Sequence, residues 1–151
     1  DEMGSAVHAA SLERPVKLMI ALEMIGYYDS TPGSQDYPYP AMSWLYPDRG
    51  DFIAVVGRMQ DINAVRQVKA ALLSSRDLSV YSMNAPGFIP GIDFSDHLNY
   101  WQHDIPAVMI TDTAFYRNKQ YHLPGDIADR LNYQKMAQVV DGVITLLYNS
   151  K

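Results

Sequence analysis

The sequence contains no cysteine, which excludes disulfide bonds and metal sites built from thiolates. It is also poor in basic residues, with 12 lysines and arginines against 17 aspartates and glutamates and a formal net charge of −5. Because phosphate binding needs a basic face, nucleic acid is not expected as a partner. No apolar run reaches the roughly 18 residues that a membrane span requires, so no membrane partner is expected. The absence of cysteine suits oxidising and reducing compartments equally, and localisation stays unknown.

The 151 residues are 48% apolar and 19% charged, which predicts one domain, residues 1–151, with its own core. Apolar runs alternate with stretches of helical periodicity, and this alternation predicts an α/β fold with a mostly parallel or mixed sheet flanked by helices. Strands are expected at residues 16–25, 51–57, 78–83 and 105–111, and helices at 4–14, 61–75, 95–101 and 132–148.

Two helical stretches show clear apolar spacing. The first, 4–14, has Ala6, Val7, Ala10 and Leu12 as candidate buried positions and ends at a proline. In the last, the residues at three- and four-residue spacing are Tyr133, Met136, Ala137, Val140, Val143, Ile144 and Leu147.

Ligands of open α/β sheets bind at the carboxyl ends of the strands, and two ionisable residues are expected there. Glu23 interrupts the apolar run "MIALEMIG" near the end of the first strand, and His122 lies in the loop after the fourth strand. Each alone is more often a solvated residue than a ligand. Together they are the oxygen and nitrogen donors that zinc accepts, although two ligands do not make a site. The long loop at 27–50, rich in proline, tyrosine and serine, is also a candidate functional segment.

Other polar residues near these loops have two readings each. Ser95 and Asp96 are typical of a helix N-terminus, but Asp96 could instead orient a metal ligand from behind. Arg117 could bind a substrate carboxylate or backbone, or it could brace its loop. His8 and His103 are expected to be surface residues.

Several segments in order resemble one known family: "ALEMIGYY", "GSQDYP", "GDFIAVVG", "SDHLNYW", "IPAVMITDTAFYRNKQYH" and "LNYQKMAQVVDGV". The chain resembles the C-terminal half of the zinc-dependent aminopeptidases with two co-catalytic zincs, a group that includes bacterial leucyl aminopeptidases and, more distantly, glutaminyl cyclases. The resemblance implies an α/β catalytic domain of the zinc-exopeptidase type, seen here from its C-terminal part.

The same resemblance implies roles for individual residues. Glu23 and His122 match metal ligands, and Asp96 matches a supporting aspartate. The aromatic residues Phe115, Tyr116 and Tyr121, together with Arg117, would bind the substrate. The family's histidine-x-aspartate pair and bridging aspartate have no match upstream of Glu23. Its adjacent glutamates, one of them the general base, have none either, because Asp1 and Glu2 lie too close to Gly4-Ser5 for that motif.

The expected parent function is hydrolysis of the N-terminal residue of a peptide, with two zincs per complete site. No catalytic residue is assigned within the chain, and the general base is expected upstream. The chain alone is expected to be inactive, to bind zinc weakly and to self-associate through an uncovered sheet edge. The alternative is a non-catalytic domain that keeps the fold and binds a peptide or partner, with the loop at 27–50 as its contact.

Overall fold

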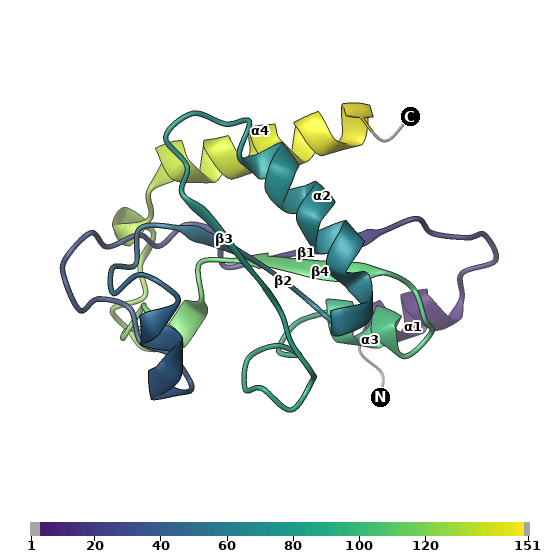
Figure 1. Cartoon of the computed structure of the whole chain (residues 1–151), viewed down its shortest axis with the longest axis horizontal. Coiled ribbons are helices and arrows are strands. Elements are labelled where there is room, and N and C mark those ends of the chain that lie inside the picture. Colours follow the sequence, from purple (N-terminus) through teal and green to yellow (C-terminus); the bar gives the residue numbers. More distant parts are fainter. Residues whose placement is uncertain (1–3, 150–151) are drawn as a thin grey trace.

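The computed structural model describes residues 4–149 of the chain, and Figure 1 shows a sheet with helices on both sides. The strands are β1 (Met19–Glu23), β2 (Ile53–Gly57), β3 (Val80–Asn84) and β4 (Ala107–Thr111). The α-helices are α1 (Gly4–Ala10), α2 (Ile62–Leu72), α3 (His97–Trp101) and α4 (Tyr133–Asn149). Short 3₁₀ turns lie at Pro40–Trp44, Met59–Asp61, Ala114–Tyr116 and Ala128–Arg130.

All four strands form one sheet in the order β1-β4-β2-β3, which confirms the predicted α/β fold. The sheet is mixed, because β1 runs parallel to β4 and β2 runs parallel to β3, whereas β2 and β4 are antiparallel. The carboxyl ends of β1 and β4 therefore lie at the same end of the sheet as the start of β2 and β3. The loops that follow β1 and β4 therefore lie at the same end of the sheet as the loop that leads into β2.

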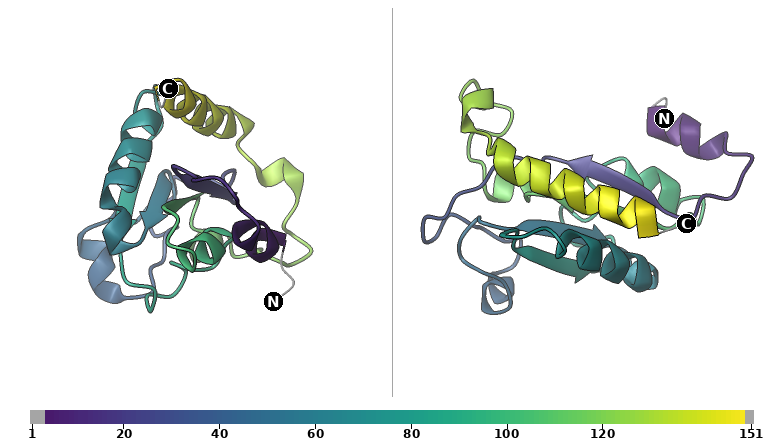
Figure 2. Two further views of the ribbon diagram at one scale, coloured as in Figure 1. Left: turned by 90° about the vertical axis from the view of Figure 1, so that its right-hand side faces the viewer. Right: turned by 90° about the horizontal axis from the view of Figure 1, so that it is seen from above.

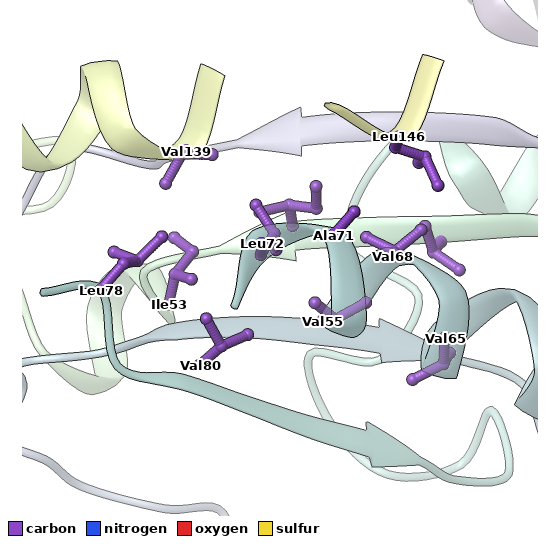
Figure 3. Close-up of a cluster of buried hydrophobic side chains, with 12 residues drawn as sticks. Ile53, Val55, Val65, Val68, Ala71, Leu72, Leu78, Val80, Val139 and Leu146 are labelled. Atoms are coloured by element: carbon purple, nitrogen blue, oxygen red, sulfur yellow. The ribbon is translucent and has the colours of Figure 1, made fainter. Parts of the chain in front are cut away.

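Helices α2 and α4 cover one face of the sheet and pack against each other (Figure 2). Their shared core contains Val65, Val68 and Leu72 of α2, and Val139 and Leu146 of α4, above the strand residues drawn in Figure 3. Gly142 permits this close packing, since a Cβ there would lie 2.8 Å from the backbone of Leu72. Helices α1 and α3 pack on the opposite face, where Tyr100 and Trp101 are buried.

Two of the predicted helix faces need correction. Helix α1 ends at Ala10, and it buries Ala9, while Val7 is 59% exposed. Helix α4 buries Val139, Gly142 and Leu146, so most of the apolar series inferred from its spacing lies beside the buried face and is partly uncovered. Among residues 4–149, no helix is both long enough and apolar enough to cross a membrane.

Candidate functional site

A pocket of ≈ 110 Å³ opens over the sheet at the carboxyl ends of β1 and β4, on the face that carries α3. Its floor is formed by strand residues such as Ala54, Val56 and Met109. Three loops form its walls: 27–50, the segment between β3 and α3, and the segment after β4. They contribute Gln35, Asp36, Tyr37, Pro38, Met42, Tyr46, Pro90, Gly91, Ile92, Phe94, Thr113, Ala114, Phe115, Tyr116 and Tyr121.

Glu23 is the one glutamate that lines this pocket. It is the last residue of β1 and pairs with Thr111, the last residue of β4. The hydroxyl of Ser95 donates a 2.9 Å hydrogen bond to Oε2 of Glu23. A carboxylate at a partly buried strand end needs such a partner, and Ser95 supplies it from a segment 72 residues away.

Asp112 fixes the turn that follows Glu23. Its carboxylate accepts hydrogen bonds from the backbone N–H groups of Gly26 at 3.1 Å, Tyr27 at 2.7 Å and Ala114 at 3.0 Å. Burial raises the pKa of Asp112 to about 6, although these three donors and the nearby Arg117 favour its charged form. The turns it joins contain three non-glycine residues with positive φ, Met24 at 51°, Thr113 at 75° and Ala114 at 49°. Such a conformation is held by its surroundings, and Asp112 is part of them.

A run of aromatic rings leads from the segment holding Ser95 to His122. Phe94 lies 6.2 Å from Phe115 between ring centroids, and Phe115 lies 5.8 Å from Tyr121. His122 stacks on Tyr121 with centroids 3.9 Å apart and an interplanar angle of 17°. His122 is exposed, has a φ of 58°, and does not line the pocket itself. The structure thus places Glu23 and Tyr121, the residue before His122, in the lining of one pocket. The role of Glu23 and His122 as metal ligands stays a prediction.

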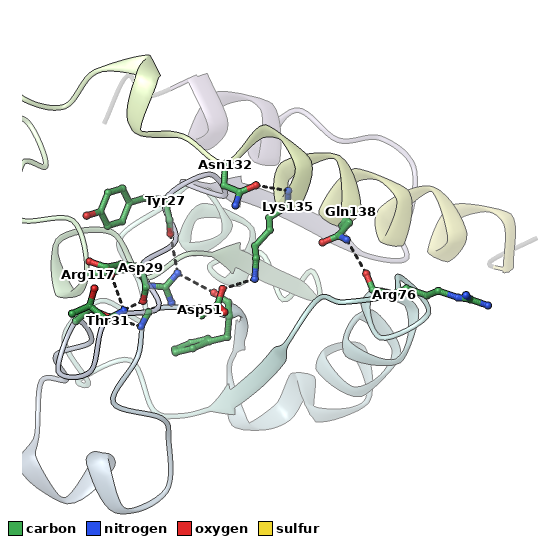
Figure 4. Close-up of polar contacts among 12 residues, drawn as sticks. Tyr27, Asp29, Thr31, Asp51, Arg76, Arg117, Asn132, Lys135 and Gln138 are labelled. Atoms are coloured by element: carbon green, nitrogen blue, oxygen red, sulfur yellow. Dashed lines mark hydrogen bonds and ion pairs between the residues drawn. The ribbon is translucent and has the colours of Figure 1, made fainter.

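Three of the four residues expected to bind substrate, Phe115, Tyr116 and Tyr121, line the pocket. Arg117 does not. Its guanidinium is buried and donates at 3.0 Å to the carbonyl of Tyr27, a residue labelled beside it in Figure 4. It also donates to Oε1 of Gln35 and to the carbonyl of Phe52, both at 2.9 Å. Burial lowers the pKa of Arg117 from its ordinary value. These contacts favour the second reading of Arg117, in which it braces the loops around the pocket.

Asp96 lies outside the pocket, where its side chain is exposed and accepts a 2.6 Å hydrogen bond from the Ser5 hydroxyl. The residue beside it, Ser95, is predicted from the sequence to cap a helix. In the structure its hydroxyl instead bonds Glu23, and α3 begins at His97. His8 bonds Tyr100 on the α1–α3 side, and His103 is exposed. His97, which the sequence did not single out, is fully buried, with Nε2 2.7 Å from the Ile92 carbonyl and a pKa lowered by burial.

Residues 4–149 contain no group of three or more histidine, aspartate and glutamate side chains placed to hold a metal ion. Asp1 and Glu2 lie outside the described residues. The donor set of the described part of the chain, Glu23 with one oxygen engaged by Ser95 and the separate His122, does not fit a zinc site by itself.

No protein-family profile matches the sequence. The chain is 95% identical over 151 residues to YfbL of Escherichia coli strain K12, a protein of uncharacterised function. The match covers 100% of this chain and 47% of YfbL, so the chain spans about half the length of that relative.

Solved structures of aminopeptidases share the fold. The LapA aminopeptidase of Legionella pneumophila superposes with a TM-score of 0.66 at 21% identity, over 95% of this chain and 34% of LapA. BSAP, a zinc aminopeptidase of Bacillus subtilis, gives 0.63 at 16% identity over 97% of this chain and 32% of BSAP. An aminopeptidase of Aneurinibacillus sp. strain AM-1 gives 0.62 at 20% identity, over 96% of this chain and 29% of that protein. The chain therefore shares its fold with about a third of the length of each of these aminopeptidases.

Proposed function

We propose that this chain forms part of a peptidase that removes the N-terminal residue of peptides, and that it supplies the pocket for that residue's side chain. The observation that carries the proposal is the placement of Glu23 in the wall of an otherwise largely apolar, aromatic pocket. Support comes from the fold, which the chain shares with aminopeptidases including a zinc enzyme. Such a pocket combines apolar walls with a few polar groups that fix the ligand's orientation.

The size of the pocket suits one side chain. Its ≈ 110 Å³ is well below the roughly 300–1,000 Å³ of sites that enclose a whole small molecule. An apolar side chain would contact Phe115, Tyr116 and Tyr121, and the peptide's amino terminus would lie toward Glu23. A carboxylate beside an apolar wall attracts a cation more strongly than it does in bulk water, because the local dielectric constant is lower. Glu23, held by Ser95, would therefore favour a cation at this end of the pocket: a zinc ion in a complete site, and the peptide's amino terminus where no metal is bound.

BSAP, which shares the fold, is a zinc aminopeptidase, and the resemblance of the sequence implies two zincs in a complete site. Because the described residues do not fit such a site alone, ligands from outside residues 4–149 would be needed, with Glu23 and His122 as this chain's share. The hydrolytic step is accordingly a property of a longer polypeptide. We assign to this chain the binding and orientation of the substrate.

The test uses the longer E. coli relative, purified with zinc and assayed on a series of aminoacyl chromogenic substrates. We expect turnover that favours apolar N-terminal residues over glycine and aspartate, and loss of turnover on Glu23→Gln. Phe115→Ala should lower kcat/KM for the apolar substrates by about 10-fold, the scale of a lost apolar contact in a pocket. Phe88→Ala is the matched control, because Phe88 is 77% exposed and does not line the pocket.

A non-catalytic peptide-binding domain is the second candidate. The lack of a three-residue metal-binding group within residues 4–149 favours it. The same assay separates the two, since a binding domain would bind the peptides with affinity that depends on Phe115 and show no turnover in the full-length relative.

A further inference from the structure

We propose that Asn118 is a positioning residue for the pocket, because it holds the 118–126 loop in the conformation that places Tyr121 in the pocket wall. Asn118 does not line the pocket itself, whereas Tyr121 does. The consequence for substrates rests on the proposed function, but the contacts that carry the inference do not. Asn118 would thus contribute to the preference for an apolar N-terminal residue without touching the peptide.

The 118–126 loop has no apolar core of its own. It lies between the 3₁₀ turns at Ala114–Tyr116 and Ala128–Arg130 and contains no helix or strand. Asn118 is the one buried residue of the loop, with 1% of its surface exposed, whereas His122, Leu123 and Pro124 at the tip are exposed. Burial of apolar surface is the main source of stability in a folded chain, and this loop has almost none. Its conformation therefore depends on hydrogen bonds.

The side chain of Asn118 closes the loop across its base. Its Nδ2 donates to Oδ1 of Asp126 at 2.8 Å, which joins the first and last residues of the loop. Its Oδ1 accepts hydrogen bonds from the backbone N–H of Gln120 and from Nη1 of Arg130, both at 3.0 Å. Because Oδ1 faces two donors and Nδ2 faces a carboxylate, these partners fix the orientation of the amide. A buried amide is costly unless its polar atoms are paired, and both polar atoms of Asn118 are paired.

Arg130 connects the base of the loop to the segment that follows β1. Its Nη1 also donates to the carbonyl of Gly125 at 3.3 Å, and its Nη2 donates to the hydroxyl of Tyr27 at 2.9 Å. The guanidinium lies over the Tyr27 ring, 4.8 Å from the ring centroid. The backbone N–H of Tyr27 is in turn bound by Asp112, which fixes the turn after β1. The base of the loop is therefore attached to the same turn that follows Glu23.

The contacts at the base determine where the tip of the loop lies. The N–H of Tyr121 donates to the carbonyl of Asn118 at 3.1 Å, so Tyr121 is bonded directly to the base. Its ring stacks on His122 and lies 5.8 Å from the ring of Phe115, which also lines the pocket. The φ of 58° at His122 is unfavourable for a residue other than glycine and persists only where the surroundings hold it. Loss of the contacts at Asn118 would release Tyr121 from the pocket wall.

The test exchanges the amide and the carboxylate at the loop base in the longer E. coli relative, with residues numbered as in this chain. Asn118→Asp places two carboxylates against each other where the structure has a 2.8 Å hydrogen bond, and like charges at that separation repel. The double variant Asn118→Asp/Asp126→Asn restores one amide facing one carboxylate and leaves the net charge unchanged. It therefore separates the loss of this contact from the loss of a particular residue.

The readout is the ratio of kcat/KM for a leucyl chromogenic substrate to kcat/KM for the glycyl one. A change in the fraction of folded enzyme cancels in this ratio, so a merely structural role of Asn118 would not alter it. We expect the ratio to fall about 10-fold in Asn118→Asp, the scale of a lost apolar contact in a pocket. It should return to the wild-type value in the double variant. Asn63→Asp is the matched control, because Asn63 is exposed on α2, which covers the other face of the sheet.

Proton NMR of the isolated chain gives a second readout that needs no turnover. Stacking on Tyr121 shields the ring protons of His122, so their signals should lie upfield of those of the exposed His103. Spectra at about pH 9, where a histidine of ordinary pKa is neutral, make the two rings comparable. We expect the upfield shift to be lost in Asn118→Asp and regained in the double variant.

Three results would overturn the role of Asn118: an unchanged substrate ratio in Asn118→Asp, a double variant that fails to recover the ratio, or an upfield shift of His122 that survives in Asn118→Asp. A full-length relative without any turnover would contradict the proposed function instead. In that case the NMR comparison of the three chains decides the role of Asn118 by itself.

Discussion

Ser95 and Glu23 are joined by a 2.9 Å hydrogen bond that links the segment before α3 to the end of β1. The hydrogen bond sets the orientation of Glu23, the one glutamate that lines the pocket. It also connects Glu23 to Phe94, which precedes Ser95 in the chain and lines the same pocket. The two positions are therefore expected to be coupled in energy.

A double-mutant cycle on the isolated chain measures this coupling. Ser95→Ala, Glu23→Ala and the double variant should give a coupling free energy of about 1 kcal/mol, the usual net value of such a bond at a partly exposed site. The measurement is urea unfolding of the four proteins. Ser79→Ala with Glu23→Ala is the control cycle, because Ser79 is exposed and precedes β3, at the edge of the sheet opposite β1, and it should show no coupling. A Ser95 cycle that also gives zero would mean that the bond does not hold Glu23.

Arg117 is expected to be a stabilising residue whose removal loosens the pocket walls. Arg117→Met would leave the carbonyls of Tyr27 and Phe52 without donors, and we expect a loss of about 3 kcal/mol in the free energy of unfolding. Arg66→Met on the exposed side of α2 is the control and should change stability by less than about 0.5 kcal/mol. If Arg117→Met unfolds at the same urea concentration as the wild type, the bracing role is refuted.

Much of the fold could be predicted because the strands are short apolar runs separated by helical patterns. The antiparallel relation of β2 to β4 could not, since no local pattern of residues records strand direction. The apolar spacing of α4 pointed to Val140, Ile144 and Leu147, whereas the described chain buries Val139 and Leu146. Periodicity defines an apolar face, but the neighbours that are present decide which part of it is covered.

The site could be predicted in part for a similar reason. Glu23 and the aromatic loop after β4 were identifiable because each follows an apolar run whose carboxyl end had to lie at one edge of the sheet. The local context of Ser95 predicts a helix cap, whereas its hydrogen-bond partner is 72 residues away. The sequence does not decide between the two roles of Arg117, because its acceptors on Tyr27 and Phe52 come from distant segments. Contacts of long sequence separation have no local signal.

Asp112 is expected to make stability fall as the pH rises from about 4 to about 6. Its pKa in the folded chain is raised to about 6 from an ordinary value of 3.8, so folding favours the protonated form. The resulting stabilisation is complete below the pKa that Asp112 has in the unfolded chain. It is lost as the pH rises through the pKa that Asp112 has in the folded chain. A shift of about 2 units corresponds to about 3 kcal/mol.

The measurement is urea unfolding of wild type and Asp112→Asn between pH 4 and 7. The variant cannot titrate at this position, so the difference in slope between the two curves isolates Asp112 from other groups such as the buried His97. Asp112→Asn should be less stable overall, because one of its three backbone donors would face an amide nitrogen. Parallel curves for the two proteins would show that Asp112 is ionised throughout this range.

The isolated 151-residue chain is expected to show no aminopeptidase turnover and weak zinc binding. The argument is a count of ligands. A structural or catalytic zinc takes three or four protein ligands, and a two-metal site needs a bridging group and a base in addition. The resemblance of the sequence gives Glu23 and His122 as ligands, and the described residues contain no cluster of three donors. Two ligands from separate segments, the end of β1 and the loop after β4, leave most of the coordination to water.

The test is a chromogenic aminopeptidase assay of the purified chain with added zinc, paired with calorimetric titration of zinc into wild type, Glu23→Ala and His122→Ala. His103→Ala is the control, since His103 is exposed and adjoins neither the pocket nor its loops. We expect no turnover in any of the four proteins, and a weak zinc affinity that falls in the Glu23 and His122 variants alone. Turnover that survives purification and disappears in both of those variants would mean that the chain assembles a complete site by itself, with Asp1 and Glu2 as the first residues to substitute next.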